Sequence, residues 1–107
     1  MRLGYVTKEE VRNLTGLTDR ELEDRRLDQI IQEAERMVEI YTGKAWTETN
    51  SEYSQIQTVT RMLAASLAYE AIPLTEEVHG KAARYHELAV LLLRSMRVTG
   101  SAPLKTA

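Results

Sequence analysis

The chain has 107 residues, of which 43% are hydrophobic and 28% charged, the balance of one globular domain and not of a disordered chain. It contains no cysteine, which excludes disulfides and thiolate metal sites, and no apolar run approaches the length of a membrane span. The net charge of −2 gives no bulk electrostatic attraction for nucleic acid or for an acidic membrane surface.

A short helix is predicted near the N-terminus. Apolar residues recur with a helical period of 3.6 along nearly the whole chain, and no segment alternates as a strand does. Thr7, three residues before a glutamate, is the pattern of a capping box, which predicts a helix over residues 8–14. Val11 and Leu14 would share its apolar face, and Gly16 would end it.

A long amphipathic segment follows and runs to Tyr41. Thr18 and Glu21 repeat the capping-box pattern at its start, and the charged sequence EDRR at 23–26 suggests a break between a short turn and the main helix. After Leu27, its apolar residues are spaced by three and four. They are Leu22, Leu27, Ile30, Ile31, Ala34, Met37, Val38 and Tyr41.

The sequence YTGKAW at 41–46 ends this helix. Gly43 stands where a left-handed C-terminal residue is expected, because glycine adopts positive φ without a Cβ penalty. Tyr41 is in phase with the apolar stripe, so we expect its ring to lie against the core, with Trp46 folding back over the helix end. We interpret Tyr41, Thr42, Gly43 and Trp46 as a structural signature that needs no chemistry.

Two longer helices are predicted in the C-terminal half. The third covers about residues 52–72 and stops before Pro73; its apolar face carries Ile56, Val59, Leu63, Leu67 and Ala71. The fourth is capped by Thr75 and runs to about Val98; its inward residues are Val78, Ala82, Tyr85, Leu88, Ala89 and Leu92. The sequence thus predicts one all-α domain over residues 1–98, a small bundle of about four helices, and a flexible tail at 99–107.

The third and fourth helices carry more apolar residues than one buried face needs. The segments MLAASLAYEAI at 62–72 and LAVLLLRSM at 88–96 are apolar on more than one face, which is typical of a helix that is central or shared with another chain. We infer that part of this surface meets a partner subunit, and a compact core with both helices central is the alternative. The candidate interface residues are Met62, Leu91, Leu93 and Met96.

No pattern of residues points to a catalytic, cofactor or metal site. His79 and His86 are seven residues apart, without the convergent ligands that a metal requires, so we expect two solvated histidines. The carboxylates of Glu76 and Glu77 lie in a first helical turn, where the helix dipole stabilises them. We therefore predict that the chain is not an enzyme, and a small helical enzyme or ligand-binding domain is a further alternative.

One segment has the outline of a helix-turn-helix, TKEEVRNLTGLTDRELEDRR at 7–26. Arg20, Arg25 and Arg26 would be the phosphate contacts. The same segment and the residues after it are acidic at Asp19, Glu21, Glu23, Asp24 and Asp28. These carboxylates would repel the phosphates that supply most DNA affinity, so a small DNA-binding regulator is kept as the alternative function.

Taken together, the chain resembles the head–tail connector proteins (adaptor or head-completion proteins) of long-tailed bacteriophages and related prophages. The resemblance covers most of residues 5–98, and its most characteristic element is Tyr41-Thr42-Gly43 followed by a basic residue. The matching segments are VTKEEVRNLTGL, LDQIIQEAERMVEIYTGKAW, AASLAYEA and ARYHELAVLLLRSM. The loop between the second and third helices is short for this family.

The resemblance implies a small all-α subunit that assembles into a ring of about a dozen copies beneath the portal of a DNA-filled capsid. Such a ring extends the DNA channel and offers a surface to the next neck or tail protein. The implied location is the head–tail junction of the virion, with the host cytoplasm during assembly. No catalysis, no cofactor and no membrane partner are implied, and DNA is expected to pass through without tight binding.

Overall fold

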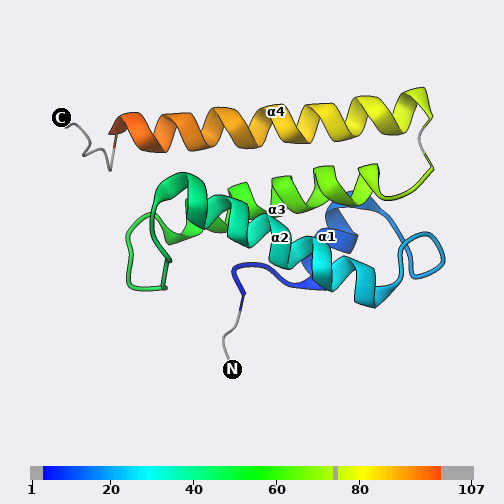
Figure 1. Cartoon of the computed structure of the whole chain (residues 1–107), viewed down its shortest axis with the longest axis horizontal. Helices are drawn as coiled ribbons and strands as arrows, with labels where there is room; N and C mark the ends of the chain where they lie inside the picture. The colour runs from blue at the N-terminus through cyan, green and yellow to red at the C-terminus, as the bar shows by residue number, and fades with distance from the viewer. Residues whose placement is uncertain (1–3, 74, 100–107) are drawn as a thin grey trace.

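The computed structural model describes residues 4–73 and 75–99, and over these residues the chain is an all-α bundle without strands, as predicted (Figure 1). The four helices are α1 (Lys8–Thr15), α2 (Asp24–Thr42), α3 (Tyr53–Glu70) and α4 (Glu76–Thr99). In Figure 1, α3 lies between α4 on one side and α1 and α2 on the other. α4 runs antiparallel to α3 and in the same general direction as α2.

The helix ends follow the local chemistry that the sequence predicted. The Thr7 hydroxyl accepts a hydrogen bond from the Glu10 N–H at 3.1 Å, and the Glu10 carboxylate accepts one from the Thr7 N–H at 2.9 Å. At the start of α4, the Thr75 hydroxyl accepts from the Val78 N–H at 3.1 Å. Gly16 ends α1 in the left-handed conformation, with φ of 76°.

The second capping-box pattern closes a turn and does not begin a helix. The Glu21 carboxylate accepts hydrogen bonds from the Thr18 N–H at 2.9 Å and from the Thr18 hydroxyl at 3.0 Å. The chain then passes through Leu22, which is buried, and α2 begins only at Asp24. The break predicted at 23–26 is therefore confirmed, and Thr18 with Glu21 stabilises the connection between α1 and α2.

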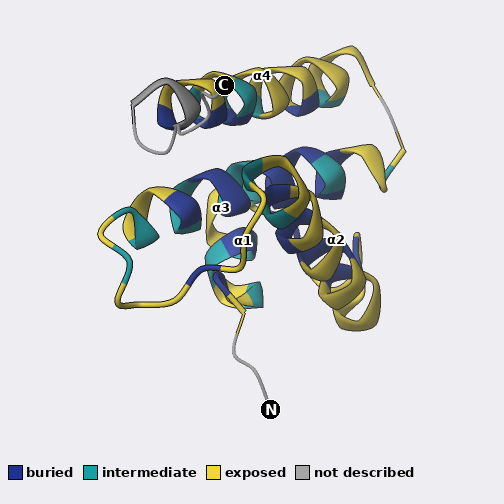
Figure 2. Ribbon diagram, turned by 60° about the vertical axis from the view of Figure 1, so that its left-hand side comes forward, coloured by how far each residue is buried: buried dark blue, intermediate teal, exposed yellow. Residues whose placement is uncertain are grey.

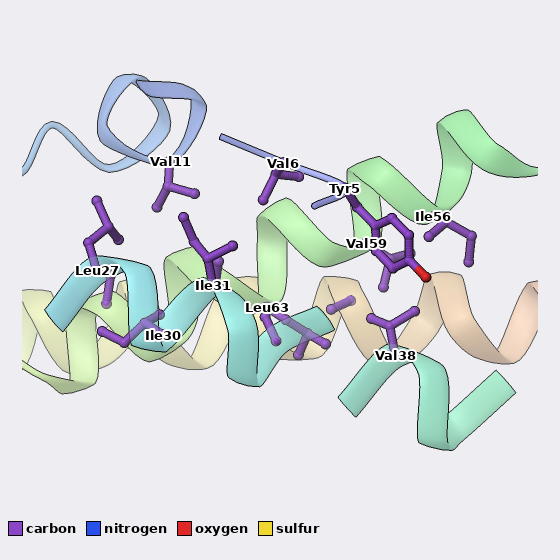
Figure 3. Close-up of a cluster of buried hydrophobic side chains, with 14 of the residues drawn as sticks. Tyr5, Val6, Val11, Leu27, Ile30, Ile31, Val38, Ile56, Val59 and Leu63 are labelled. Carbon is purple, nitrogen blue, oxygen red and sulfur yellow. The ribbon is translucent and has the colours of Figure 1, made fainter. Parts of the chain in front are cut away.

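The core is centred on α3, whose side chains are buried in several directions (Figure 2). Figure 3 shows side chains from the N-terminal segment, α1 and α2 converging on Ile56, Val59 and Leu63 of α3. The alanines on its remaining faces, Ala64 and Ala68, are fully buried and let neighbouring helices approach closely. The apolar excess predicted for the third helix is therefore covered within the chain, which is the compact alternative.

α4 packs on α3 through one face only. Ala82 and Ala89 are buried in the contact, and the Ser66 hydroxyl donates a 2.9 Å hydrogen bond to the Ala82 carbonyl. Small residues at both positions allow this close approach. Figure 2 shows the opposite surface of α4 exposed along the helix.

The expected boundary between the domain and its tail falls inside α4. The helix includes Thr99, the first residue of the predicted tail at 99–107. The rest of that segment, residues 100–107, lies outside the described residues.

Two glycines offer a matched test of backbone conformation. Gly43 ends α2 with φ of 81°, whereas Gly80 lies within α4, and an added Cβ would meet no atom within 4 Å at either position. Gly43→Ala should therefore cost about 1–2 kcal/mol of unfolding free energy, the penalty of a left-handed alanine. Gly80→Ala should add about 0.5–1 kcal/mol, because alanine is the better helix former.

Urea denaturation of both variants, followed by circular dichroism, measures the two changes. Shifts of the same sign would contradict the left-handed assignment of Gly43.

Candidate functional site

The YTGKAW sequence forms a closed turn at the end of α2. Thr42 donates its hydroxyl to the Val38 carbonyl at 2.8 Å and accepts a hydrogen bond from the Trp46 indole N–H at 2.9 Å. Gly43 reverses the chain between them. Trp46 is buried, as predicted, and the Lys44 ammonium lies 4.4 Å from the centre of its ring.

Tyr5, which no sequence pattern singled out, joins this turn to the rest of the molecule. The Trp46 backbone N–H donates to the Tyr5 hydroxyl at 2.9 Å, and that hydroxyl donates to the Glu39 carboxylate at 2.6 Å. The Tyr5 backbone N–H donates to Glu35 at 2.7 Å, and the Gln57 amide donates to the Tyr5 carbonyl at 3.2 Å. One N-terminal residue thus bridges α2, α3 and the turn.

A signal for this contact was present in the sequence of α2. Glu35 stands on the buried side of the helix, between Ile31 one turn before it and Val38 one turn after it. A carboxylate at such a position requires a hydrogen-bond donor, because burial of an unpaired polar group is costly. One donor is the backbone N–H of Tyr5, which lies 30 residues away in the sequence.

Tyr41 does not lie against the core, and this prediction is wrong. Its side chain is 38% exposed, and Met37, one turn before it, is exposed as well. At this end of α2, the inner side of the helix is occupied by Val38 and by Trp46, which reaches back to Thr42. Of the predicted signature, three residues therefore build the turn, and Tyr41 contributes to the surface.

The four candidate interface residues separate into two groups. Leu93 and Met96 are only 5% and 8% exposed and belong to the hydrophobic core, so their prediction as surplus surface is corrected: both point from α4 towards α3. Met62 is half-buried and packs against the same core. Leu91 is 54% exposed.

Two apolar patches remain on the surface. The α2 patch consists of Met37, Ile40 and Tyr41, which share one side of the helix because they are three and four residues apart; Ile40 is 74% exposed. The α4 patch is centred on Leu91 and includes the half-buried Leu88 and Leu92. Leu91 follows the buried Ala89 by two residues, a rotation of about 200° around the helix, so it lies on the outer surface of α4.

The connection between α1 and α2 is organised by the half-buried side chain of Arg12. The Arg12 guanidinium donates to Asp19 at 2.9 Å, to Asp24 at 2.7 Å, and to the backbone carbonyls of Leu17 and Leu22 at 3.2 and 2.9 Å. This hydrogen bond from Arg12 holds the pKa of the Asp24 carboxyl below its usual value.

The geometry differs from that of a helix-turn-helix. The connection between α1 and α2 has eight residues, whereas the DNA-binding motif joins its helices by a turn of about 3–4 residues. Arg20, Arg25 and Arg26 are exposed, but Asp19 and Asp24 lie beside them on the same loop and first helical turn.

His79 and His86 are exposed, and no group of three or more potential metal ligands occurs within residues 4–73 and 75–99. None of the helices in this described part combines the length and the apolar character needed to cross a membrane. No family model, curated protein or solved structure matches the chain.

The Tyr5 hydroxyl can be tested by removing one oxygen atom. Tyr5→Phe removes the hydroxyl that accepts from the buried Trp46 N–H and donates to Glu39, so it should lower the free energy of unfolding by about 1–3 kcal/mol. Tyr53→Phe is the control: its ring packs edge-on against Tyr5, and no described contact uses its hydroxyl. It should change stability by less than about 0.5 kcal/mol.

Trp46 is the only tryptophan, so its fluorescence reports unfolding of this turn directly. Equal effects of the two phenylalanine substitutions would show that the hydrogen bonds of Tyr5 contribute nothing.

The Arg12–Asp24 contact predicts a pH dependence of stability. Because the pKa of Asp24 is lowered in the folded state, its contribution is present above the usual pKa of 3.8 and disappears as the pH falls through the lower folded value. Asp24→Asn should therefore melt below the wild type at neutral pH, and the two should converge in strong acid. Glu23→Gln is the control. It also removes a carboxylate charge, one residue before Asp24, and the Glu23 side chain makes no capping hydrogen bond.

Thermal denaturation of wild type and both variants, from neutral pH to strong acid, measures these differences in melting temperature. A difference between wild type and Asp24→Asn that persists unchanged in acid would exclude the Arg12 contact as its cause.

Proposed function

We propose that this chain is a structural subunit of the neck of a tailed bacteriophage or prophage. Copies of it would form a ring between the portal and the tail or next neck protein, and the ring would extend the DNA channel. The proposal rests first on the resemblance of residues 5–98 to head–tail connector proteins, centred on Tyr41-Thr42-Gly43.

The observation that carries the proposal is the presence of two apolar patches on different helices. The chain covers neither Ile40 of the α2 patch nor Leu91 of the α4 patch. A ring subunit meets two neighbours through two different surfaces, because head-to-tail contacts are heterologous. Two separate patches suit this arrangement better than the single self-complementary patch of a two-fold dimer.

The charge distribution also suits a DNA channel. The first 50 residues carry 11 acidic and 8 basic side chains. A basic lumen would retain DNA, since each neutralised phosphate releases counterions and adds affinity. A ring of these chains would instead surround the duplex with weak repulsion, screened over about 8–10 Å at physiological salt.

Assembly and DNA binding together test the proposal. Native mass spectrometry and negative-stain electron microscopy of the concentrated protein should detect closed rings. A mobility-shift assay at about 0.15 M salt should detect no binding to duplex DNA, because the net charge is negative.

A sequence-specific regulator would give the opposite results. It would select particular duplexes from a random pool, with affinities near 10⁻⁸ M or tighter at about physiological salt. Such selection, lost on substitution of Arg20, Arg25 or Arg26, would replace the connector proposal by the regulator.

A further inference from the structure

The α2 patch and the α4 patch have the same spacing with opposite charges. Along α2, the exposed side reads Glu33, Arg36, Met37, Ile40 and Tyr41. Along α4, residues at the same intervals are Arg84, Glu87, Leu88, Leu91 and Leu92. Each patch therefore begins with two charges three residues apart and continues with three apolar side chains, and the order of the two charges is reversed between them.

These charges are available to a second molecule. Glu33 and Arg36 on α2, and Arg84 and Glu87 on α4, are all exposed. Within the described residues, none of the four forms an ion pair or a side-chain hydrogen bond. A helix laid on another in parallel, with Ile40 opposite Leu91, would place Glu33 opposite Arg84 and Arg36 opposite Glu87.

The antiparallel orientation is less complementary. When Ile40 again lies opposite Leu91, the antiparallel orientation places the Arg94 guanidinium opposite Met37. It also leaves Glu33 without a basic residue opposite it. Charges set against apolar side chains lose hydration without gaining a partner. The charge pattern therefore selects the parallel orientation.

The two patches do not cover one another within one molecule. Ile40 and Leu91, the most exposed member of each patch, are 74% and 54% exposed, although α2 and α4 also make a small direct contact. Leu92, at the inner edge of the α4 patch, packs against the core. A second copy of the chain carries both patches and so supplies the complementary surface for each.

We infer that the α2 patch of one copy docks in parallel on the α4 patch of a second copy, in a head-to-tail contact. This inference deepens the proposed ring and rests on it for closure. In a ring of about a dozen copies, neighbours differ by a rotation of about 30°. α2 and α4 run in the same general direction within one copy, so after a rotation of this size the helices of neighbouring copies would still point the same general way (Figure 1).

Disulfide trapping tests the contact, and the chain suits it because it contains no cysteine. Two single variants, Ile40→Cys and Leu91→Cys, are mixed in equal amounts and oxidised. Helices in contact lie about 8–10 Å apart, which brings facing Cα atoms within the range that a disulfide spans. The mixed disulfide should form in several-fold excess over either homodimer.

A second set of cysteine pairs tests whether the two helices dock in parallel or antiparallel. Met37→Cys should crosslink efficiently to Leu88→Cys, its partner in the parallel register, and poorly to Arg94→Cys, its partner in the antiparallel one. The reverse preference would overturn the inference. So would a statistical mixture of dimers from Ile40→Cys and Leu91→Cys, because random collisions alone produce that mixture.

Charge exchange provides a second, non-covalent readout by native mass spectrometry. Glu33→Arg and Arg84→Glu should each shift the protein towards smaller species, because each opposes like charges. The double variant restores opposite charges in every contact and should recover the assembly. If the double variant assembles less well than both single variants, the two residues do not face each other and the inference fails.

The failure of the inference and the failure of the ring can be told apart. Rings of the wild-type protein without the mixed disulfide would leave the proposed function standing and remove this contact. A selective mixed disulfide with open chains that grow with concentration would keep the contact and remove the closed ring, since a head-to-tail contact forms either.

Discussion

The requirement that α3 be covered on nearly all sides determines how the other helices are placed. Its buried residues point in several directions, and no single neighbour can cover them. α1 and α2 cover one side, and α4 covers the other. Because the chain uses three helices to cover one, no helix is left to cover the outer surface of α4. The exposed Leu91 follows from this division.

The turn at the end of α2 has a structural role that explains its residue types. Gly43 provides the left-handed reversal, and Thr42 supplies an oxygen that serves both the helix carbonyl and the Trp46 indole. Tyr5 then receives the Trp46 backbone N–H. Each contact depends on the others, because Trp46 reaches Tyr5 only if the chain reverses at Gly43. The contacts within the fold therefore account for the residue types of this turn.

Much of the fold could be predicted from local sequence. Caps, glycines and a proline that act within a few residues mark both ends of α1, the C-terminal ends of α2 and α3 and the start of α4, and the all-α class follows from the apolar period. The break before Asp24 was also visible in the charged sequence at 23–26. These features are local, so they need no knowledge of which helices are neighbours.

The candidate site was harder to predict because it depends on contacts between distant residues. The bond between Tyr5 and Glu35 joins residues 30 positions apart, and the placement of Leu93 depends on how α4 lies on α3. Periodicity ranked Leu91 and Leu93 together as surplus, yet one is exposed and the other is core. Only the orientation of the helix about its axis separates them, and tertiary packing sets that orientation.

The orientation of the helices also determines which surface charges lie beside the apolar patches. On the sequence alone, Glu33, Arg36, Arg84 and Glu87 are ordinary solvated residues of two amphipathic helices. The structure places each pair beside exposed apolar side chains, where a neighbouring molecule would bury them partly and screen them less from one another. Apolar contact would then supply most of the binding energy, while the reversed order of charges would select one orientation and one register. A contact with these properties joins unlike surfaces, so each copy that docks leaves a second surface free for the next one.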